Sequence, residues 1–251
     1  MVEKIELDKI ETIAKEAGKA IMEIYKEDFE VKYKEDESPL TKADLIANSI
    51  ICEELSKLYS DIPILSEENK AVPYEKRKDW EYYWCIDPID GTKEFIQKNG
   101  EFTVNIALIE KGTPVLGVVY APAIDELYTA KKGEGAFKNG KRLPLKTNQN
   151  PQKELLVVAS KSHLSKETQE FIDTLKAQKI KQVSKGSSLK LCMVAEGSAD
   201  IYPRLAPTME WDTAAADAIV REAGKVSYIF DTKEALCYNK ENLLNPWFIV
   251  K

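Results

Sequence analysis

The sequence predicts a layered α/β fold in which an N-terminal half rich in antiparallel strands precedes a half that alternates strands and helices. Three observations support this prediction. Two amphipathic helical stretches lie within residues 10–58, strand patterns joined by short turns occupy residues 102–143, and strands alternate with helices from residue 155 onward. With 251 residues, of which 43% are hydrophobic, the chain can bury one large core or two smaller ones that pack together.

The first part of the chain predicts two helices and two strands. Apolar side chains repeat at helical spacing from Ile10 to Ile24, which defines one buried face. After a charged, turn-like stretch at 30–38, Thr41 has the position of a helix cap, with Asp44 three residues later, and a second amphipathic helix follows. The remaining segments are strands at 62–65 and 82–86 and a polar loop at 71–79.

Strand signals dominate the next fifty residues. An antiparallel meander is predicted, and Asn139-Gly140 marks a two-residue hairpin. A polar stretch at 147–153 suggests a boundary between an N-terminal half at 1–150 and a C-terminal half at 151–251. The meander strands lie at 102–109, 115–120 and 127–130, and the later elements are strands at 155–159, 180–183, 201–202, 226–229 and 247–250 and helices at 166–177, 189–196 and 213–223.

Composition excludes several classes of protein. A net charge of −6 argues against a partner that is a nucleic acid polymer, because phosphate neutralisation needs a basic face. The four cysteines lack paired spacing, which favours free buried thiols, and the single histidine, His163, cannot supply a zinc site. No signal peptide and no apolar run of membrane-spanning length is present, so a cytoplasmic protein without a transmembrane segment is expected.

The stretch Asp87-Pro88-Ile89-Asp90-Gly91-Thr92 carries the strongest functional signal. Two carboxylates follow a strand, and the proline between them stiffens their backbone. Such ligands favour hard cations such as Mg²⁺, with Asp87 as a bridging ligand and the Ile89 carbonyl as a further one. Gly91 lets the backbone approach a phosphate, whose oxygens the amides of Gly91 and Thr92 would bind. The structural alternative is an Asp-Pro turn followed by an aspartate that caps a helix.

Three other acidic positions fit the same site. Glu67 follows an apolar strand, Asp44 opens a helix, and Asp212 precedes a helical stretch. Each has a simpler explanation: a solvated Glu-Glu pair, a charge that offsets a helix dipole, and an N-cap. Together they supply the ligands that two or three hard cations need, so the sequence predicts a magnesium-dependent phosphatase.

These residues, in this order, resemble the lithium-sensitive, magnesium-dependent phosphatase family of inositol monophosphatase. The match runs through Asp44, Glu67-Glu68, Asp87–Thr92 and Trp211-Asp212, and so spans essentially the whole chain. Thr92-Lys93-Glu94-Phe95-Ile96 is similar to the 3′(2′),5′-bisphosphate nucleotidase branch, as are Gly186-Ser187-Ser188 and Ser160-Lys161-Ser162-His163. Ala223-Gly224 departs from the Gly-Gly of many members, at a position that suits a helix C-cap.

The resemblance implies a five-layer α-β-α-β-α sandwich of the inositol monophosphatase and fructose-1,6-bisphosphatase type. It also assigns roles to residues. Glu67, Asp87 and the Ile89 carbonyl would hold one Mg²⁺, whereas Asp87, Asp90 and Asp212 would hold another, with Mn²⁺ as a possible substitute. Asp44 and Thr92, with Glu67 close by, would orient and deprotonate the attacking water.

The substrate implied by the resemblance is 3′-phosphoadenosine 5′-phosphate, which would be hydrolysed to AMP and phosphate. His163, Ser187, Lys190 and Arg204 would surround the nucleotide, although His163 can equally be a surface residue and the two cations ordinary solvated charges. An inositol monophosphatase is the main alternative, and a nucleotide or metal sensor without turnover is another. Fructose-1,6-bisphosphatase activity is more distant, and the sequence leaves the oligomeric state open, with a homodimer possible.

Overall fold

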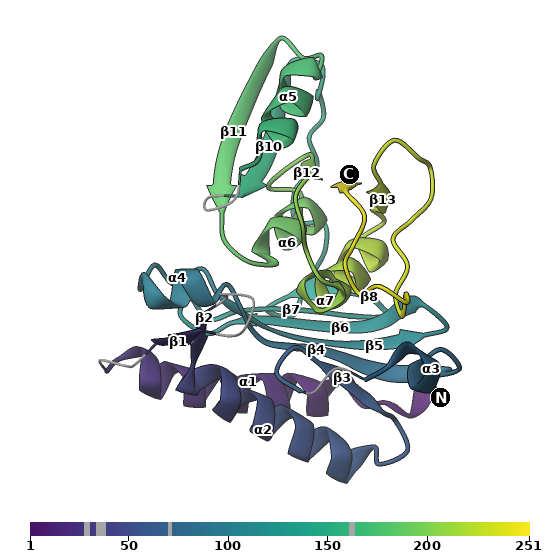
Figure 1. Cartoon of the computed structure of the whole chain (residues 1–251). Coiled ribbons are helices and arrows are strands. Elements are labelled where there is room, and N and C mark those ends of the chain that lie inside the picture. The colour runs from purple at the N-terminus through teal and green to yellow at the C-terminus, as the bar shows by residue number, and fades with distance from the viewer. Residues whose placement is uncertain (28–30, 34–38, 70–71, 161–163) are drawn as a thin grey trace.

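The fold is a stack in the order helix, sheet, helix, sheet, helix (Figure 1). A computed structural model describes residues 1–27, 31–33, 39–69, 72–160 and 164–251. Within this part of the chain, none of the helices combines the length and the apolar character that a membrane crossing requires. The predicted division at residues 150/151 stays a prediction.

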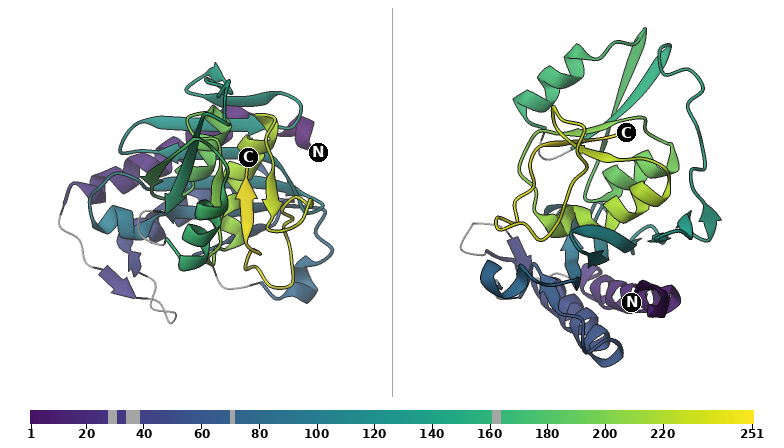
Figure 2. Two further views of the ribbon diagram at one scale, coloured as in Figure 1. Left: turned by 90° about the horizontal axis from the view of Figure 1, so that it is seen from above. Right: turned by 90° about the vertical axis from the view of Figure 1, so that its right-hand side faces the viewer.

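Two long helices form the bottom layer, α1 (Leu7–Tyr25) and α2 (Lys42–Leu58). Figure 2 shows them side by side beneath the large sheet. The buried face of α1 follows the predicted apolar stripe, and the capping box of Thr41 and Asp44 that starts α2 is confirmed. Gly18 lets α1 approach the sheet closely, since a Cβ there would lie 2.6 Å from the ring of Tyr120.

The second layer is a seven-stranded sheet in the order β3-β4-β5-β6-β7-β8-β9. Its first pair is parallel and the others are antiparallel, which confirms the predicted meander. The hairpin prediction is also confirmed, because Asn139 and Gly140 both have positive φ and join β8 to β9. The strands are β3 (Ile64–Ser66), β4 (Tyr82–Asp90), β5 (Thr103–Glu110), β6 (Thr113–Ala121), β7 (Glu126–Lys131), β8 (Gly135–Lys138) and β9 (Lys141–Arg142).

The third layer contains α6 (Leu189–Glu196) and α7 (Glu210–Glu222), which cover the upper face of this sheet. The approach of α7 to β6 depends on Gly117, because a Cβ there would lie 2.1 Å from the carbonyl oxygen of Ala215. The sheet therefore has an apolar core on each face, one against α1 and α2 and one against α6 and α7.

The upper sheet and the outer helix complete the stack. β10 (Glu154–Ser160) pairs in parallel with β11 (Lys179–Lys185), and a bridge between Val157 and Ile201 connects β10 to the strands β12, β14 and β13. Val158 packs with the α6 and α7 core, whereas Val157 and Ala159 pack toward α5, so β10 separates two layers. The remaining bounds are α5 (Lys166–Thr174), β12 (Tyr202–Arg204), β13 (Ser227–Ile229) and β14 (Phe248–Val250).

Several local predictions were wrong or incomplete. The predicted loop at 71–79 contains a short helix, α3 (Tyr74–Arg77). Its last residue, Arg77, is buried and bonds the nearby Val72 and the distant Asn239 and Glu241, and these contacts fix the helix. All four cysteines are free as predicted, but only Cys85 and Cys192 are buried. The elements outside the prediction are a 3-10 turn (Val2–Lys4) and β1 (Val31–Tyr33), which pairs with β2 (Pro39–Thr41) at the edges of the turn-like stretch. The short helical turn expected from Gly91 and Thr92 onward is α4 (Thr92–Ile96).

Candidate metal centre and substrate pocket

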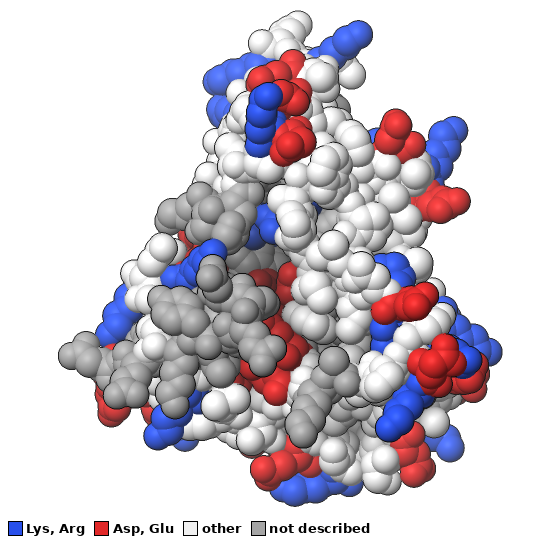
Figure 3. Space-filling model, in the orientation of Figure 1, with Lys and Arg blue, Asp and Glu red and all other residues white. Residues whose placement is uncertain are grey.

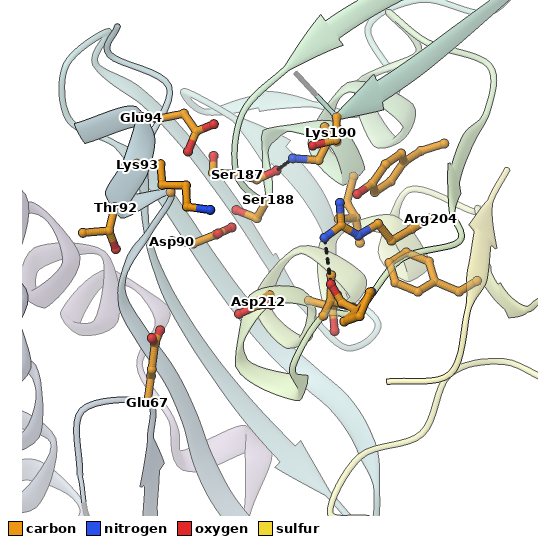
Figure 4. A pocket seen from close by; sticks show the side chains of 18 residues that line it. Glu67, Asp90, Thr92, Lys93, Glu94, Ser187, Ser188, Lys190, Arg204 and Asp212 are labelled. Carbon is orange, nitrogen blue, oxygen red and sulfur yellow. Dashed lines mark hydrogen bonds between the residues drawn. The ribbon is translucent and has the colours of Figure 1, made fainter. Parts of the chain in front are cut away.

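A pocket of about 290 Å³ opens between the large sheet and the helices α6 and α7. In Figure 3, acidic side chains gather in a hollow at the centre of the molecule, with basic atoms above them. Both halves of the chain contribute, and Figure 4 shows Asp90 and Glu94, with Lys93 beside them, on one side and the cations Lys190 and Arg204 on the other. The pocket is lined by Glu67, Asp90, Gly91, Thr92, Lys93, Glu94, Ser160, Ser187, Ser188, Lys190, Leu191, Tyr202, Arg204, Pro207, Thr208, Asp212, Thr213 and Phe248.

Three carboxylates at the acidic end form a cluster. Glu67, Asp87 and Asp212 each offer an oxygen, and these oxygens all lie within 4.8 Å of one another. They come from the turn after β3, from β4 and from α7, so only the folded chain brings them together. Carboxylate oxygens at this spacing are the donor set that hard divalent cations prefer.

Local backbone structure fixes each member of the cluster. The register of β4 with β5 shifts between Asp87 and Asp90, so the Asp-Pro-Ile-Asp stretch is an irregular end of the strand. The Ile89 amide donates to Asp87 Oδ1 at 3.0 Å, and the Glu67 amide donates to the Ile86 carbonyl at 3.1 Å. Both interactions limit how far these carboxylates can move.

Asp212 is not the N-cap residue of its helix, contrary to the alternative considered from sequence. The helix α7 starts two residues earlier, at Glu210, and the cap is Met209. Asp212 is the third residue of the helix, and its Oδ2 accepts the Met209 amide at 2.8 Å. One oxygen thus secures the helix start, while the residue lines the pocket.

The electrostatics of the cluster favour a bound cation. Burial raises the pKa of Asp87 and of Asp212 well above the ordinary value, and repulsion from neighbouring carboxylates raises both further. Burial likewise raises the pKa of Asp90 to about 6, although the positive charge of Lys190 opposes the shift. Buried like charges of this kind are stable only when a cation or protons neutralise them, so the residues present fit a divalent metal ion.

Asp44 and Thr92 lie together beside the cluster, as the proposed water-activating pair requires. Asp44 Oδ2 accepts the Thr41 amide at 2.8 Å and the Thr41 hydroxyl at 2.6 Å. The Thr92 hydroxyl lies 3.4 Å from Asp44 Oδ1 and 3.3 Å from the Ile89 carbonyl oxygen. Burial raises the pKa of Asp44 despite the hydrogen bonds from Thr41, which gives it more affinity for a proton than an exposed carboxylate has.

Gly91 and Gly186 bring two loops into contact at the rim. Gly91 has φ +90°, and a Cβ there would lie 3.2 Å from the Glu101 carbonyl oxygen. A Cβ at Gly186 would lie 2.7 Å from the same oxygen and 2.7 Å from Glu94 Cγ. The loop after β4 and the loop before α6 therefore close on each other only because both positions lack a side chain.

The opposite wall carries the predicted cations. Lys190 is 7% exposed, and its Nζ donates to the Ser187 carbonyl at 2.5 Å. Arg204 Nη2 donates to the Pro207 carbonyl at 2.7 Å, and its buried Nε has no hydrogen-bond partner among the residues that the structure describes. Burial, with a smaller contribution from the nearby Arg204, lowers the pKa of Lys190 to about 8 against the pull of Asp90.

Most of the residues proposed from sequence converge on this pocket. Asp87 is buried behind its lining, and the Ile89 side chain lies in the lower core while its carbonyl faces Thr92. His163 lies outside the described residues, so its role stays a prediction.

Lys93, Glu94 and Ser188 line the pocket but were not assigned roles. Lys93 and Glu94 follow Thr92 within the motif, and their place in the first turn of α4 was the available signal. Ser188 belongs to the motif Gly186-Ser187-Ser188, but its bonds to Thr103 and Asn105 of β5 could not be predicted from that motif.

The sequence profile of the inositol monophosphatase family matches residues 3–246. This chain belongs to the inositol monophosphatase family. Like other members of the family, it has an acidic cluster that could bind metal. The predicted fold is also confirmed, because the structure of CysQ from Bacteroides thetaiotaomicron, a bacterial member of the family, superposes with a TM-score of 0.88. That chain is 44% identical, and the match covers 98% of this chain and 96% of that one.

Other relatives carry more specific names. The 3′(2′),5′-bisphosphate nucleotidase CysQ of Salmonella typhimurium is 45% identical over 97% of this chain and 98% of its own. The nucleotidase of the same name from Escherichia coli K12 is 43% identical over the same shares. Thermotoga maritima IMPase is 28% identical, with a TM-score of 0.78, over 95% of this chain and 89% of its own. These matches identify the chain as a phosphatase.

Proposed function

We propose that this phosphatase is a 3′(2′),5′-bisphosphate nucleotidase that hydrolyses 3′-phosphoadenosine 5′-phosphate to AMP and phosphate. One observation carries the proposal: the pocket has a carboxylate cluster at one end and two cations, the buried Lys190 and the half-buried Arg204, at the other. A metal-loaded cluster attracts one phosphate, and the cations attract a second, so the pocket suits a substrate with two phosphates. The names and full-length similarity of the relatives support the same substrate.

The acidic end would hold Mg²⁺, as two or three ions, with Mn²⁺ as a substitute. Glu67, Asp87 and the Ile89 carbonyl form one proposed ligand set, and Asp87, Asp90 and Asp212 form the other. When bound, the metal supplies Lewis-acid stabilisation of the phosphoryl oxygens and lowers the pKa of a bound water. Lithium is expected to inhibit by taking a metal position with less charge.

Asp44, Thr92 and Glu67 would prepare the attacking water. With its proton directed to Asp44 Oδ1, 3.4 Å away, the Thr92 hydroxyl keeps its lone pairs free to accept a hydrogen bond from water. Asp44 would then take the proton that this relay releases, which its raised pKa favours. The amides of Gly91 and Thr92 would bind the phosphate oxygens, and water would attack without a covalent phosphoenzyme.

The cations Lys190 and Arg204 would bind the second phosphate. Among the described residues, neither has a carboxylate within the 4.0 Å of an ion pair. A buried cation such as Lys190 is costly unless an anion neutralises it, and the pocket that Lys190 and Arg204 both line can admit an anion. A sulfate would satisfy the same donors, so the 5′-phosphosulfate analogue is a second expected substrate, which would place the enzyme in sulfate assimilation.

Inositol monophosphatase activity is the second candidate, because the chain shares its fold with Thermotoga maritima IMPase at 28% identity. In that case the carboxylate cluster would act as proposed, but Lys190 and Arg204 would have no second phosphate to bind. The two candidates therefore differ in the basic end of the pocket, not in the metal end.

The deciding experiment is phosphate release from 3′-phosphoadenosine 5′-phosphate and from inositol 1-phosphate, each with Mg²⁺ and with EDTA. We expect a strong preference for the nucleotide that EDTA abolishes. Preference for inositol 1-phosphate would overturn the substrate proposal, and undiminished release in EDTA would overturn the metal proposal. Tight nucleotide binding without release from any substrate would favour the sensor alternative.

A further inference from the structure

Tyr202 lies on the basic wall of the pocket, on the same strand as Arg204. Side chains two positions apart on a strand point to the same side, so β12 presents both residues to the pocket. Lys190 belongs to the first turn of α6. The Lys190 Nζ lies 5.8 Å from the centre of the Tyr202 ring.

The Tyr202 ring is held firmly. Tyr202 is only 2% exposed, and Phe248 packs edge-on against it with ring centres 5.9 Å apart. Its backbone pairs with Val250 of β14, next to the pair of Arg204 with Phe248. A ring fixed by strand pairing and by an aromatic neighbour can in turn restrict the groups that contact it.

Tyr202 also interacts with two like charges, Lys190 and Arg204. Lys190 and Arg204 repel each other, and neither is neutralised by a carboxylate within 4.0 Å in the described part of the chain. The charge of Arg204 reaches the Tyr202 hydroxyl, and the face of an aromatic ring attracts a cation such as Lys190. Contact with Tyr202 is therefore favourable for each cation, and it offsets the repulsion that would otherwise move Lys190 and Arg204 apart.

We propose that Tyr202 is a positioning residue that holds Lys190 and Arg204 as a second anion site, and so makes the pocket selective for phosphate esters that carry a second phosphate or sulfate. The inference rests on the proposed function, because it assigns the second phosphate to the basic wall. It adds a residue that touches neither the metal end nor the reacting phosphate. Its loss should therefore weaken binding of the second anion and leave the chemical step intact.

The test compares two substrates that differ only in the second anion, 3′-phosphoadenosine 5′-phosphate and adenosine 3′-monophosphate. For Tyr202→Leu, which removes the ring face and the hydroxyl, we expect KM for the bisphosphate to rise about tenfold. For Tyr202→Phe, which keeps the ring over Lys190, we expect a rise of about threefold. In both variants, kcat for the bisphosphate and kcat/KM for the monophosphate should stay within about twofold of wild type.

Tyr228→Leu is the matched control. Tyr228 is a strand tyrosine under a lysine, with Lys251 Nζ 5.6 Å from its ring centre, and it lies outside the pocket. Tyr228→Leu should leave KM and kcat unchanged for both the bisphosphate and the monophosphate. If Tyr202→Leu fails to fold in a thermal melt, Tyr202→Phe decides alone.

Three results separate the possibilities. An equal loss for both substrates would mean that Tyr202 only supports the pocket wall, and an unchanged KM for the bisphosphate would overturn the positioning role outright. If wild-type enzyme itself shows no preference for the bisphosphate over the monophosphate, the proposed second phosphate site fails, and the inference fails with it.

Discussion

In metal-free buffer at neutral pH, the variant Asp90→Asn is expected to be more stable than the wild-type protein. The wild-type carboxylate is buried near Glu94 and Glu67, and its pKa rises from 3.8 to about 6. At about 1.4 kcal/mol for each tenfold change in proton affinity, this rise corresponds to about 3 kcal/mol. Asparagine removes the charge and keeps an oxygen that can accept the Ser188 amide.

The same carboxyl fixes the sign of the pH dependence. Between about pH 4 and pH 6, the folded protein holds a proton on Asp90 that the unfolded chain has already released. The stabilisation from this proton is complete below the unfolded pKa and is lost as pH rises through about 6. Asp90→Asn lacks this contribution, so its stability should fall less between pH 4 and pH 7.

Saturating Mg²⁺ should reverse the order of stability. A ligand that binds only the folded state adds about 4.1 kcal/mol at a thousand times its Kd, which exceeds the advantage of about 3 kcal/mol that the variant has without metal. The wild-type protein gains this stabilisation with its full set of carboxylates, whereas Asp90→Asn has lost a proposed ligand and gains less. The variant should also be inactive, since the metal end is incomplete.

The assay is urea unfolding followed by tryptophan fluorescence, with EDTA or with Mg²⁺, from pH 5 to pH 8. The exposed Asp61 supplies the control variant Asp61→Asn, which should match wild type under every condition. If Asp90→Asn were less stable than wild type in EDTA at pH 7, the carboxylate would be structural, and the reasoning from charge repulsion would be refuted.

Three further variants test separate parts of the structure. Burial raises the pKa of Glu196, but hydrogen bonds from Lys138, Ser198 and Tyr128 outweigh burial and lower this pKa overall. The ionised Glu196 carboxylate therefore stabilises the fold above pH 4.5, and this stabilisation is lost as pH falls through the lowered pKa. Glu196→Gln should cost about 1–3 kcal/mol at pH 7 and flatten the acid limb of urea unfolding. Asn48 bonds Ser66 at 2.7 Å and Asn69 at 2.9 Å on either side of Glu67. Asn48→Ala should therefore raise the half-saturating Mg²⁺ concentration about tenfold with little change in kcat at saturation, unlike the exposed control Ser49→Ala. Gly91→Ala should cost about 1–2 kcal/mol in thermal unfolding and reduce kcat, whereas Gly133→Ala, at φ +80° with open space around it, should leave kcat unchanged.

Features set by neighbouring residues could be predicted from sequence. The apolar stripe of α1, the capping box of Thr41 and Asp44, and the Asn139-Gly140 hairpin each depend on a few consecutive residues, and the structure confirms them. The motif from Asp87 to Thr92 belongs to the same group, because its backbone irregularity arises within six residues.

Features set by distant contacts could not be predicted. The start of α7 was placed too late because Glu210 is buried, and its carboxylate accepts the amides of Asn239 and Lys240 from the C-terminal segment. Those contacts favour a helix start that local propensity does not reveal. The helix α3 depends in the same way on Arg77, two of whose partners, Asn239 and Glu241, lie more than 160 positions away.

The layered stack explains why the acidic and basic ends of the pocket face each other. The carboxylates Asp87 and Asp90 end a strand of the large sheet, whereas Lys190 and Arg204 belong to α6 and the upper sheet. Without metal, the acidic end repels phosphate and the basic end attracts it. A substrate with two phosphates is then attracted at one end of the pocket and repelled at the other. Metal binding reverses the sign at the acidic end, and both ends then attract anions. Metal should therefore be needed for the bisphosphate to bind across the pocket as well as for its hydrolysis.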